Sequence, residues 1–133
     1  MQPPTLTPLS KTAALRTLGV ASESEQLRIA GMIDLVVLRD GHSISHADTG
    51  LPLVYVGLSG AIGVVGDPQR RVRAPFVLDL ADRRLADSSS PDLVVQGEVQ
   101  ALMIDWRTRE TVLKSIPHLE LLLRDTRDRL EGI

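Results

Sequence analysis

The sequence predicts a small, mainly β domain with helices at both ends. Within residues 35–66, short runs of Val, Ile, Leu and Tyr are separated by breaks centred on Gly41, Gly50 and Gly60. Glycine accepts the positive φ of a tight turn, and branched or aromatic residues suit a pleated, half-buried strand. Apolar residues at both ends of the chain instead recur at helical spacing. These three observations favour a barrel or sandwich of short strands with flanking helices.

Length and composition limit the classes of protein to consider. The 133 residues predict a single domain, residues 1–133, long enough to bury a core. The net charge of -2 gives no overall basic field toward nucleic acid or anionic lipid, and three aromatic residues are too few for base stacking. Cysteine is absent, and we find neither an export signal nor an apolar run of membrane-spanning length. We therefore expect a cytoplasmic chain without membrane insertion.

The expected elements follow the chain in order. Residues 1–6 are Pro-rich and form a loose N-terminus, and residues 7–33 form helices. The second of these helices begins with a capping box made by Ser22 and Glu25. A β-roll over residues 35–106 follows, with strands expected at residues 35–39, 42–46, 53–58, 61–65, 72–80, 93–95 and 99–105. We expect residues 69–73 to form a hairpin turn with solvated arginines.

The C-terminal segment, residues 108–131, returns to helical spacing and is interrupted by Pro117. Its second part carries an apolar stripe and an opposite charged face that we expect to be solvated. The stripe either caps the domain or meets a second copy, and we predict a homodimer through it. The residues of this predicted interface are Leu119, Leu122, Leu123 and Leu130.

Several of these motifs together resemble the cyclic-nucleotide-binding domain family. The glycine-centred part consists of Arg39-Asp40-Gly41, Asp48-Thr49-Gly50 and the run from Leu53 to Gly60. The C-terminal part consists of the last strands up to Trp106, then Thr111 to Ile116, Pro117 and Leu119 to Leu130. The resemblance covers residues 9–130 and implies a jelly roll, or double-stranded β-helix, with flanking helices. Bacteria use this domain in transcription factors of the catabolite-activator type, in channels, in transporters and in kinases.

The resemblance fails in the segment where nucleotide-binding members hold their ligand. Those members have Phe-Gly-Glu, a short helix and Pro-Arg, whose amides and Arg hold the phosphate while the Glu takes the ribose hydroxyl. In this chain Phe76 is followed by Val77 and Leu78, and Ser88 and Ser89 occupy the positions of Pro-Arg. The resemblance therefore implies no binding of cAMP or cGMP in the usual manner.

Other residues offer substitutes for the missing groups. Asp79 can replace the ribose carboxylate, and Arg83 or Arg84 can replace the phosphate arginine. The alternative is that these arginines are solvated surface residues. The candidate ligand-binding residues are therefore Phe76, Asp79, Arg83, Arg84, Ser88 and Ser89.

The sequence predicts no catalytic, metal or cofactor site. His42 and His46 would lie about 13 Å apart on a strand, too far to share one metal ion. The run Gly57-Leu58-Ser59-Gly60-Ala61 lacks the spacing of a nucleophile elbow. We therefore expect no enzyme activity and no cofactor.

Three functions remain open. The first is a non-enzymatic regulatory or interaction module whose partner is a protein or a second copy. The second is a sensor of a nucleotide or another anionic small molecule. The third is the effector domain of a larger transcription factor, channel or transporter. The chain ends at Ile133, which leaves no room for a helix-turn-helix. We therefore expect no nucleic-acid binding by these residues alone.

Overall fold

The computed structural model describes residues 11–44, 53–80, 92–105 and 107–131. Four helices and eight strands lie in these ranges. The helices are α1 (Lys11–Thr17), α2 (Glu23–Ala30), α3 (Arg109–Ser115) and α4 (His118–Glu131). The strands are β1 (Asp34–Leu38), β2 (Ser43–Ile44), β3 (Val54–Gly57), β4 (Ala61–Val64), β5 (Asp67–Arg73), β6 (Phe76–Asp79), β7 (Leu93–Gln96) and β8 (Val99–Ile104).

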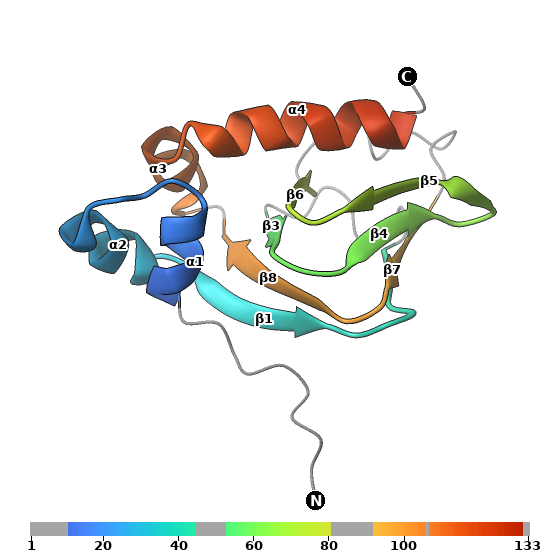
Figure 1. The fold of residues 1–133 in the computed structure, drawn as a ribbon, viewed down its shortest axis with the longest axis horizontal. Helices are drawn as coiled ribbons and strands as arrows, with labels where there is room; N and C mark the ends of the chain where they lie inside the picture. The colour runs from blue at the N-terminus through green and yellow to red at the C-terminus, as the bar shows by residue number, and fades with distance from the viewer. Residues whose placement is uncertain (1–10, 45–52, 81–91, 106, 132–133) are drawn as a thin grey trace, which may run out of the picture.

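The strands form two antiparallel sheets of four strands each (Figure 1). The first sheet has the order β1-β8-β3-β6, and the second sheet has the order β2-β7-β4-β5. Successive strands alternate between the two sheets, except for β4 and β5, which are neighbours in the second sheet, and this is the arrangement of a jelly roll. The predicted fold, a mainly β roll with helices at both ends, is confirmed.

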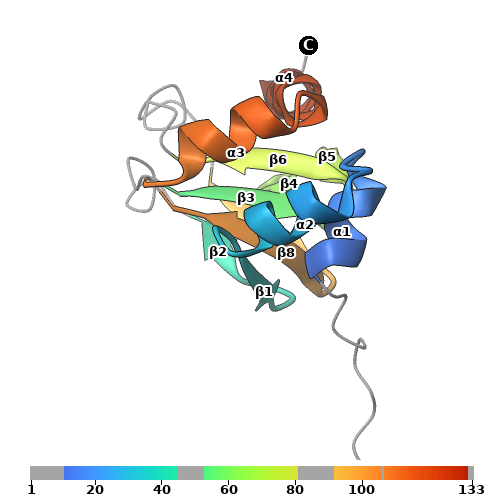
Figure 2. The same cartoon turned by 90° about the vertical axis from the view of Figure 1, so that its left-hand side faces the viewer.

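The apolar residues form two clusters on opposite faces of the first sheet. One cluster fills the space between the outer face of this sheet and helices α1 to α3, and includes Leu15, Ile29, Val56, Leu102 and Val112. The other cluster lies inside the roll, between the two sheets, and includes Ile62, Val72, Phe76, Leu78 and Val95. Figure 2 shows the helices α1 and α2 on the side of the roll at which the first sheet lies. The alternation of side chains along each strand supplies both clusters at once.

Helix α4 lies along β6 and β5, the edge strands of the two sheets (Figure 1). The backbone N–H of Val77 in β6 donates to the hydroxyl of Thr126 at 3.1 Å. The guanidinium of Arg70 in β5 donates to the backbone carbonyl of Leu130. An edge strand exposes unpaired backbone groups, and covering it with a helix satisfies part of them. Helix α4 therefore contacts both sheets, along the side of the roll at which their edge strands lie.

The glycine corners have the expected backbone conformation where the structure describes them. Gly60 has a φ of +77°, and an added Cβ there would lie 2.7 Å from the backbone carbonyl oxygen of Glu98. Gly41 has a φ of +84°. Both values lie in the left-handed region that favours glycine. Gly50, the third predicted corner, lies outside the described residues.

The helix ends also follow the sequence signals. Ser22 caps α2 by accepting a hydrogen bond from the backbone N–H of Glu25 at 3.4 Å. The other half of the predicted capping box is not seen, because the Glu25 carboxylate pairs with Arg28 and not with the backbone N–H of Ser22. Pro117 separates α3 from α4, as predicted. Among the described helices, none combines the length and the apolar character that a membrane span requires.

The prediction for residues 67–80 was wrong in two respects. Residues 69–73 belong to strand β5 and do not form a hairpin turn, and Arg70 is half-buried against α4 where a solvated side chain was expected. The single strand predicted for residues 72–80 is divided into β5 and β6 at Ala74 and Pro75. The chain passes there from the second sheet to the first, and Pro75 has no N–H to donate to either ladder. The strand predicted at residues 42–46 is seen as β2, and its part beyond Ile44 lies outside the described residues.

Candidate functional site

Strand β6 carries the first of the predicted ligand-binding residues, Phe76. Its side chain is fully buried in the cluster between the sheets. It lies opposite Gly57 of β3, and a Cβ added to Gly57 would come within 2.3 Å of the Phe76 ring. The ring therefore occupies the space that the glycine leaves open. Phe76 serves the core, and a role for it in ligand binding stays a prediction.

The next two residues of β6 are apolar and buried. Val77 packs into the cluster beneath the helices, and Leu78 packs into the cluster inside the roll. These are the positions at which the resemblance implies a glycine and a ribose carboxylate. Neither residue offers a polar side chain, and both faces of the strand are filled by the core. This part of β6 is built for packing.

Asp79, the last residue of β6, carries a carboxylate that is only 5% exposed. Arg109, the first residue of α3, donates from its Nη2 to the Asp79 Oδ2 and forms an ion pair with it. A buried carboxylate without a partner is strongly destabilising, so this contact has structural weight. It ties the strand that leads into residues 81–91 to the first C-terminal helix.

The sequence offered Asp79 as a substitute for the ribose carboxylate, and the structure gives it an internal partner. That substitute role stays a prediction. Sequence reasoning missed Arg109 as the partner because the two residues are 30 positions apart. An acidic residue directly after an apolar strand does signal that a cation must be near. With 15 Lys and Arg in the chain, the signal does not say which one.

The remaining candidate ligand residues, Arg83, Arg84, Ser88 and Ser89, lie outside the described residues. Their segment, residues 81–91, connects β6 to β7. The structure therefore brings together Phe76 and Asp79 on one strand and leaves the other four predictions untested.

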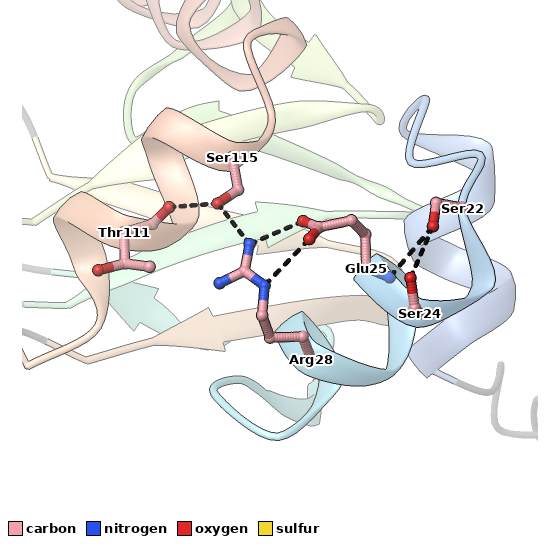
Figure 3. A network of polar contacts seen from close by, with 6 residues as sticks. All are labelled: Ser22, Ser24, Glu25, Arg28, Thr111 and Ser115. Atoms are coloured by element: carbon pink, nitrogen blue, oxygen red, sulfur yellow. Dashed lines mark hydrogen bonds and ion pairs between the residues drawn. The ribbon is translucent and has the colours of Figure 1, made fainter.

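A polar network joins α2 to α3 (Figure 3). Arg28 donates to the Glu25 carboxylate at 2.7 and 3.2 Å and to the hydroxyl of Ser115 at 3.1 Å. The Ser115 hydroxyl in turn donates to the backbone carbonyl of Thr111 at 2.7 Å. The hydrogen bond from Arg28, helped by its charge, lowers the pKa of Glu25 below the ordinary value. The network links α2 to the last residue of α3, whereas Arg109 links the first residue of α3 to β6.

A second polar contact holds the start of α3. Asp105 Oδ1 accepts from the backbone N–H of Arg107 at 2.9 Å and of Thr108 at 3.3 Å, while the Thr108 hydroxyl donates to the carbonyl of Met32. Burial acts to raise the pKa of Asp105, but the hydrogen bonds from Arg107 and Thr108 outweigh it and lower the pKa. An open groove of about 340 Å³ lies here. Its lining consists of Gly31, Met32, Ile33, Asp34, Asp105, Arg107 and Thr108.

The groove contains no arrangement of residues that indicates catalysis. Its carboxylates are engaged in capping the turn before α3 or are exposed on β1. In the part of the chain that the structure describes, no three His, Asp or Glu side chains lie close enough to hold a metal ion. The groove is therefore a feature of the junction between helices and roll.

The leucines of the predicted dimer interface pack largely inside the chain. Leu119 is 1% exposed in the cluster under the helices, and Leu130 is 6% exposed in the cluster inside the roll. Leu122 and Leu123 are half-buried against the first of these clusters. The stripe thus caps the domain, and its pairing with a second copy stays a prediction.

Comparison with known proteins gives a likeness in three dimensions only. No family model and no curated protein sequence matches the chain. Among solved structures, the heme domain of CooA from Carboxydothermus hydrogenoformans has a TM-score of 0.59 at 14% identity, covering 90% of this chain and 86% of that one. The regulatory subunit of a cAMP-independent protein kinase A from Trypanosoma brucei has a TM-score of 0.62 at 17% identity. This chain is 92% covered in that match and spans 45% of the kinase subunit.

A third solved structure is a putative cyclic nucleotide-binding protein from Geobacter metallireducens GS-15. Its TM-score is 0.52 at 11% identity, with 92% of each chain covered. All three matches cover at least 90% of this chain at 17% identity or less, so they show the fold alone. Together with the strand order of the two sheets, they show that this chain has the fold of cyclic-nucleotide-binding domains.

Proposed function

We propose that the chain is a non-enzymatic regulatory or interaction module that does not bind cAMP or cGMP in the usual manner. One observation carries this proposal. The strand that would present a glycine and a ribose carboxylate presents Val77 and Leu78, both buried in the core. The Asp79 carboxylate that follows is paired with Arg109. A nucleotide's ribose hydroxyls would find no available carboxylate on this strand.

A regulatory output is supported by the links between β6 and the C-terminal helices. Val77 is hydrogen-bonded to Thr126 of α4, and Asp79 is paired with Arg109 of α3. Both helices are thus fixed to one strand of four residues. A partner or ligand that shifts β6 must also shift these helices, which is how a binding event can be passed on. We place this module in the cytoplasm, in agreement with its lack of cysteine.

Isothermal titration calorimetry tests the nucleotide prediction. Titration of the chain with cAMP or cGMP is expected to give no saturable heat at tens of micromolar, which corresponds to a binding free energy weaker than roughly -6 kcal/mol. The physical reason is the lack of a carboxylate at Val77 and Leu78.

A Leu78→Glu variant is a poor gain-of-function control because it places a charge in the core. The useful control is a cyclic-nucleotide-binding domain of known affinity measured in the same buffer. Saturable heat with micromolar affinity for this chain would overturn the proposal.

A second candidate function is a sensor of an anionic small molecule. It is favoured by Arg109, which contacts the strand that leads into residues 81–91 and whose buried Nε atom has no hydrogen-bond partner among the described residues. An unused arginine N–H can donate a hydrogen bond to a phosphate or carboxylate oxygen there. The same calorimetry, run with a panel of nucleotides and organic acids, separates this function from the first. Saturable heat that is lost in Arg109→Lys would favour the sensor.

Self-association through α4 remains our prediction from the sequence. We expect a homodimer in sedimentation at micromolar concentration, and we expect Leu123→Asp to dissociate it because an unpaired carboxylate is costly to bury in an apolar seam. Leu123 is half-buried in the structure, so the variant must first be shown to be folded. A monomeric wild type, or a folded Leu123→Asp variant that remains dimeric, would show that the stripe only serves the domain's own core.

A further inference from the structure

The outward face of the second sheet carries two arginines at alternate positions of β5. Arg71 lies opposite Gly63, and Arg73 lies opposite Ala61. Directly opposite residues of an antiparallel pair share a face, and the side chains alternate along the strand. Val72, between the two arginines, is 1% exposed and belongs to the cluster inside the roll. Arg71 and Arg73 therefore point away from the core, and both are exposed.

Neither arginine is neutralised by the chain itself in the described residues. The ion pairs seen there involve other cations, such as Arg28 and Arg109, and none includes Arg71 or Arg73. The chain as a whole has a net charge of -2. This pair is thus a local positive patch on an otherwise slightly acidic molecule.

The surface beside the arginines consists of small residues and carries a further hydrogen-bond donor, the side chain of Gln96. Gly63 and Ala61 of β4 provide the floor, and Gln96 of β7 lies opposite Ala61 on its other side. A Cβ added to Gly63 would lie 2.2 Å from Nε2 of Gln96 and 3.6 Å from the Cβ of Arg71. The Gln96 carboxamide therefore lies across Gly63, next to Arg71. We call Arg71, Arg73 and Gln96 the basic face.

We propose that the basic face docks an extended acidic segment of a partner protein, with carboxylates at alternate positions. This inference rests on the proposed function as an interaction module and names the chemistry of its partner. Alternate residues on a strand are separated by about 6.6–6.8 Å, so Arg71 and Arg73 match the spacing of alternate side chains in an extended partner. Each guanidinium can bind a carboxylate through two parallel hydrogen bonds.

Nucleic acid and small molecules fit this face less well. Two cations neutralise too few phosphates for substantial affinity. The aromatic residues that the structure describes, Tyr55 and Phe76, lie in the first sheet, so they offer this face no surface on which a base could stack. A small anion needs an enclosing pocket, whereas the face is the outer surface of a sheet. The groove described above is a separate feature, formed by the residues that follow α2 and those that precede α3.

Fluorescence anisotropy at low ionic strength tests the proposal with a labelled peptide of alternating Glu and Thr. We expect the wild type to bind this acidic peptide saturably. We expect it not to bind the matching peptide of alternating Gln and Thr. The double variant Arg71→Ala, Arg73→Ala is expected to bind the acidic peptide about fivefold more weakly or worse, because it loses two ion pairs at an exposed surface. The double variant Arg71→Lys, Arg73→Lys keeps the charge and should lose a smaller part of the affinity.

The matched control is the double variant Arg16→Ala, Arg39→Ala, which removes the same charge from exposed positions elsewhere on the chain. Its affinity for the peptide should equal that of the wild type. The proposal is overturned by a wild type that shows no saturable binding, by equal weakening in the control variant, or by single-stranded DNA competing as well as the acidic peptide. Each of these outcomes is independent of the cAMP titration, so the two proposals fail separately.

Discussion

Replacing Arg109 by Ala is expected to lower the free energy of unfolding by about 3 kcal/mol. The substitution removes the ion pair and hydrogen bond that Arg109 gives to the carboxylate of Asp79, which is 5% exposed. Removing one partner of a buried ion pair is costly. The cost is kept near the lower end of the usual range because Asp79 keeps a further contact and because the Arg109 side chain is 32% exposed, so water can enter its place. Urea unfolding monitored by circular dichroism measures the change.

Lys114→Ala is the matched control for this prediction. Lys114 lies on the same helix and pairs with Glu110 at 3.8 Å, but both side chains are at least 75% exposed. Exposed pairs contribute little, so its stability should stay within about 0.5 kcal/mol of the wild type. If Arg109→Ala were as mild as Lys114→Ala, the contact with Asp79 would have no structural weight. The double variant Arg109→Ala, Asp79→Asn should recover part of the loss, since it removes both charges.

Phe76→Ala is expected to lower the free energy of unfolding by about 4 kcal/mol, more than Arg109→Ala. The ring is fully buried between the sheets and fills the space left by Gly57, so its removal creates a cavity that the surrounding strands cannot close. Thermal and urea unfolding of the purified variant measure this loss.

Leu121→Ala provides the comparison for Phe76→Ala. Leu121 is 62% exposed on α4, and its truncation should change stability by less than about 0.5 kcal/mol. A Phe76→Ala variant with unchanged stability would contradict the assignment of this residue to the core. It would instead return Phe76 to the set of ligand contacts that the sequence predicted.

The elements that the sequence predicted well are those with a local physical signal. The positive φ of Gly41 and Gly60 follows from the need of a tight turn, and the break between α3 and α4 follows from Pro117. The cap of α2 by Ser22 is likewise a contact between near neighbours in the chain. Such features need no knowledge of the tertiary structure.

The elements that the sequence predicted poorly depend on distant contacts. In the sequence, strand β5 resembles a polar turn because its basic run contains only one apolar residue, Val72. The strand forms because β4 supplies a ladder on one side, while α4 accepts the guanidinium of Arg70 on the other. Tertiary contacts of this kind override local preference.

The candidate site shows the same division. The buried, apolar character of Val77 and Leu78 follows from the sequence, and it is the basis of the predicted loss of nucleotide binding. The pairing of Asp79 with Arg109 does not follow from the sequence, because an ion pair across 30 residues leaves no periodic pattern. The leucine stripe of α4 was correctly assigned as apolar, but only the structure shows how much of it the domain's own core uses.

Thermal unfolding in the presence of cyclic nucleotides tests the central claim most directly. A ligand bound at about 10 μM affinity and present at about 1 mM would stabilise the folded chain by about 2.7 kcal/mol and raise the unfolding midpoint by several degrees. We predict that about 1 mM cAMP or cGMP leaves the midpoint unchanged within about 1 °C, because β6 offers Val77 and Leu78 where a ribose carboxylate is needed. A rise of several degrees with either nucleotide would contradict the account.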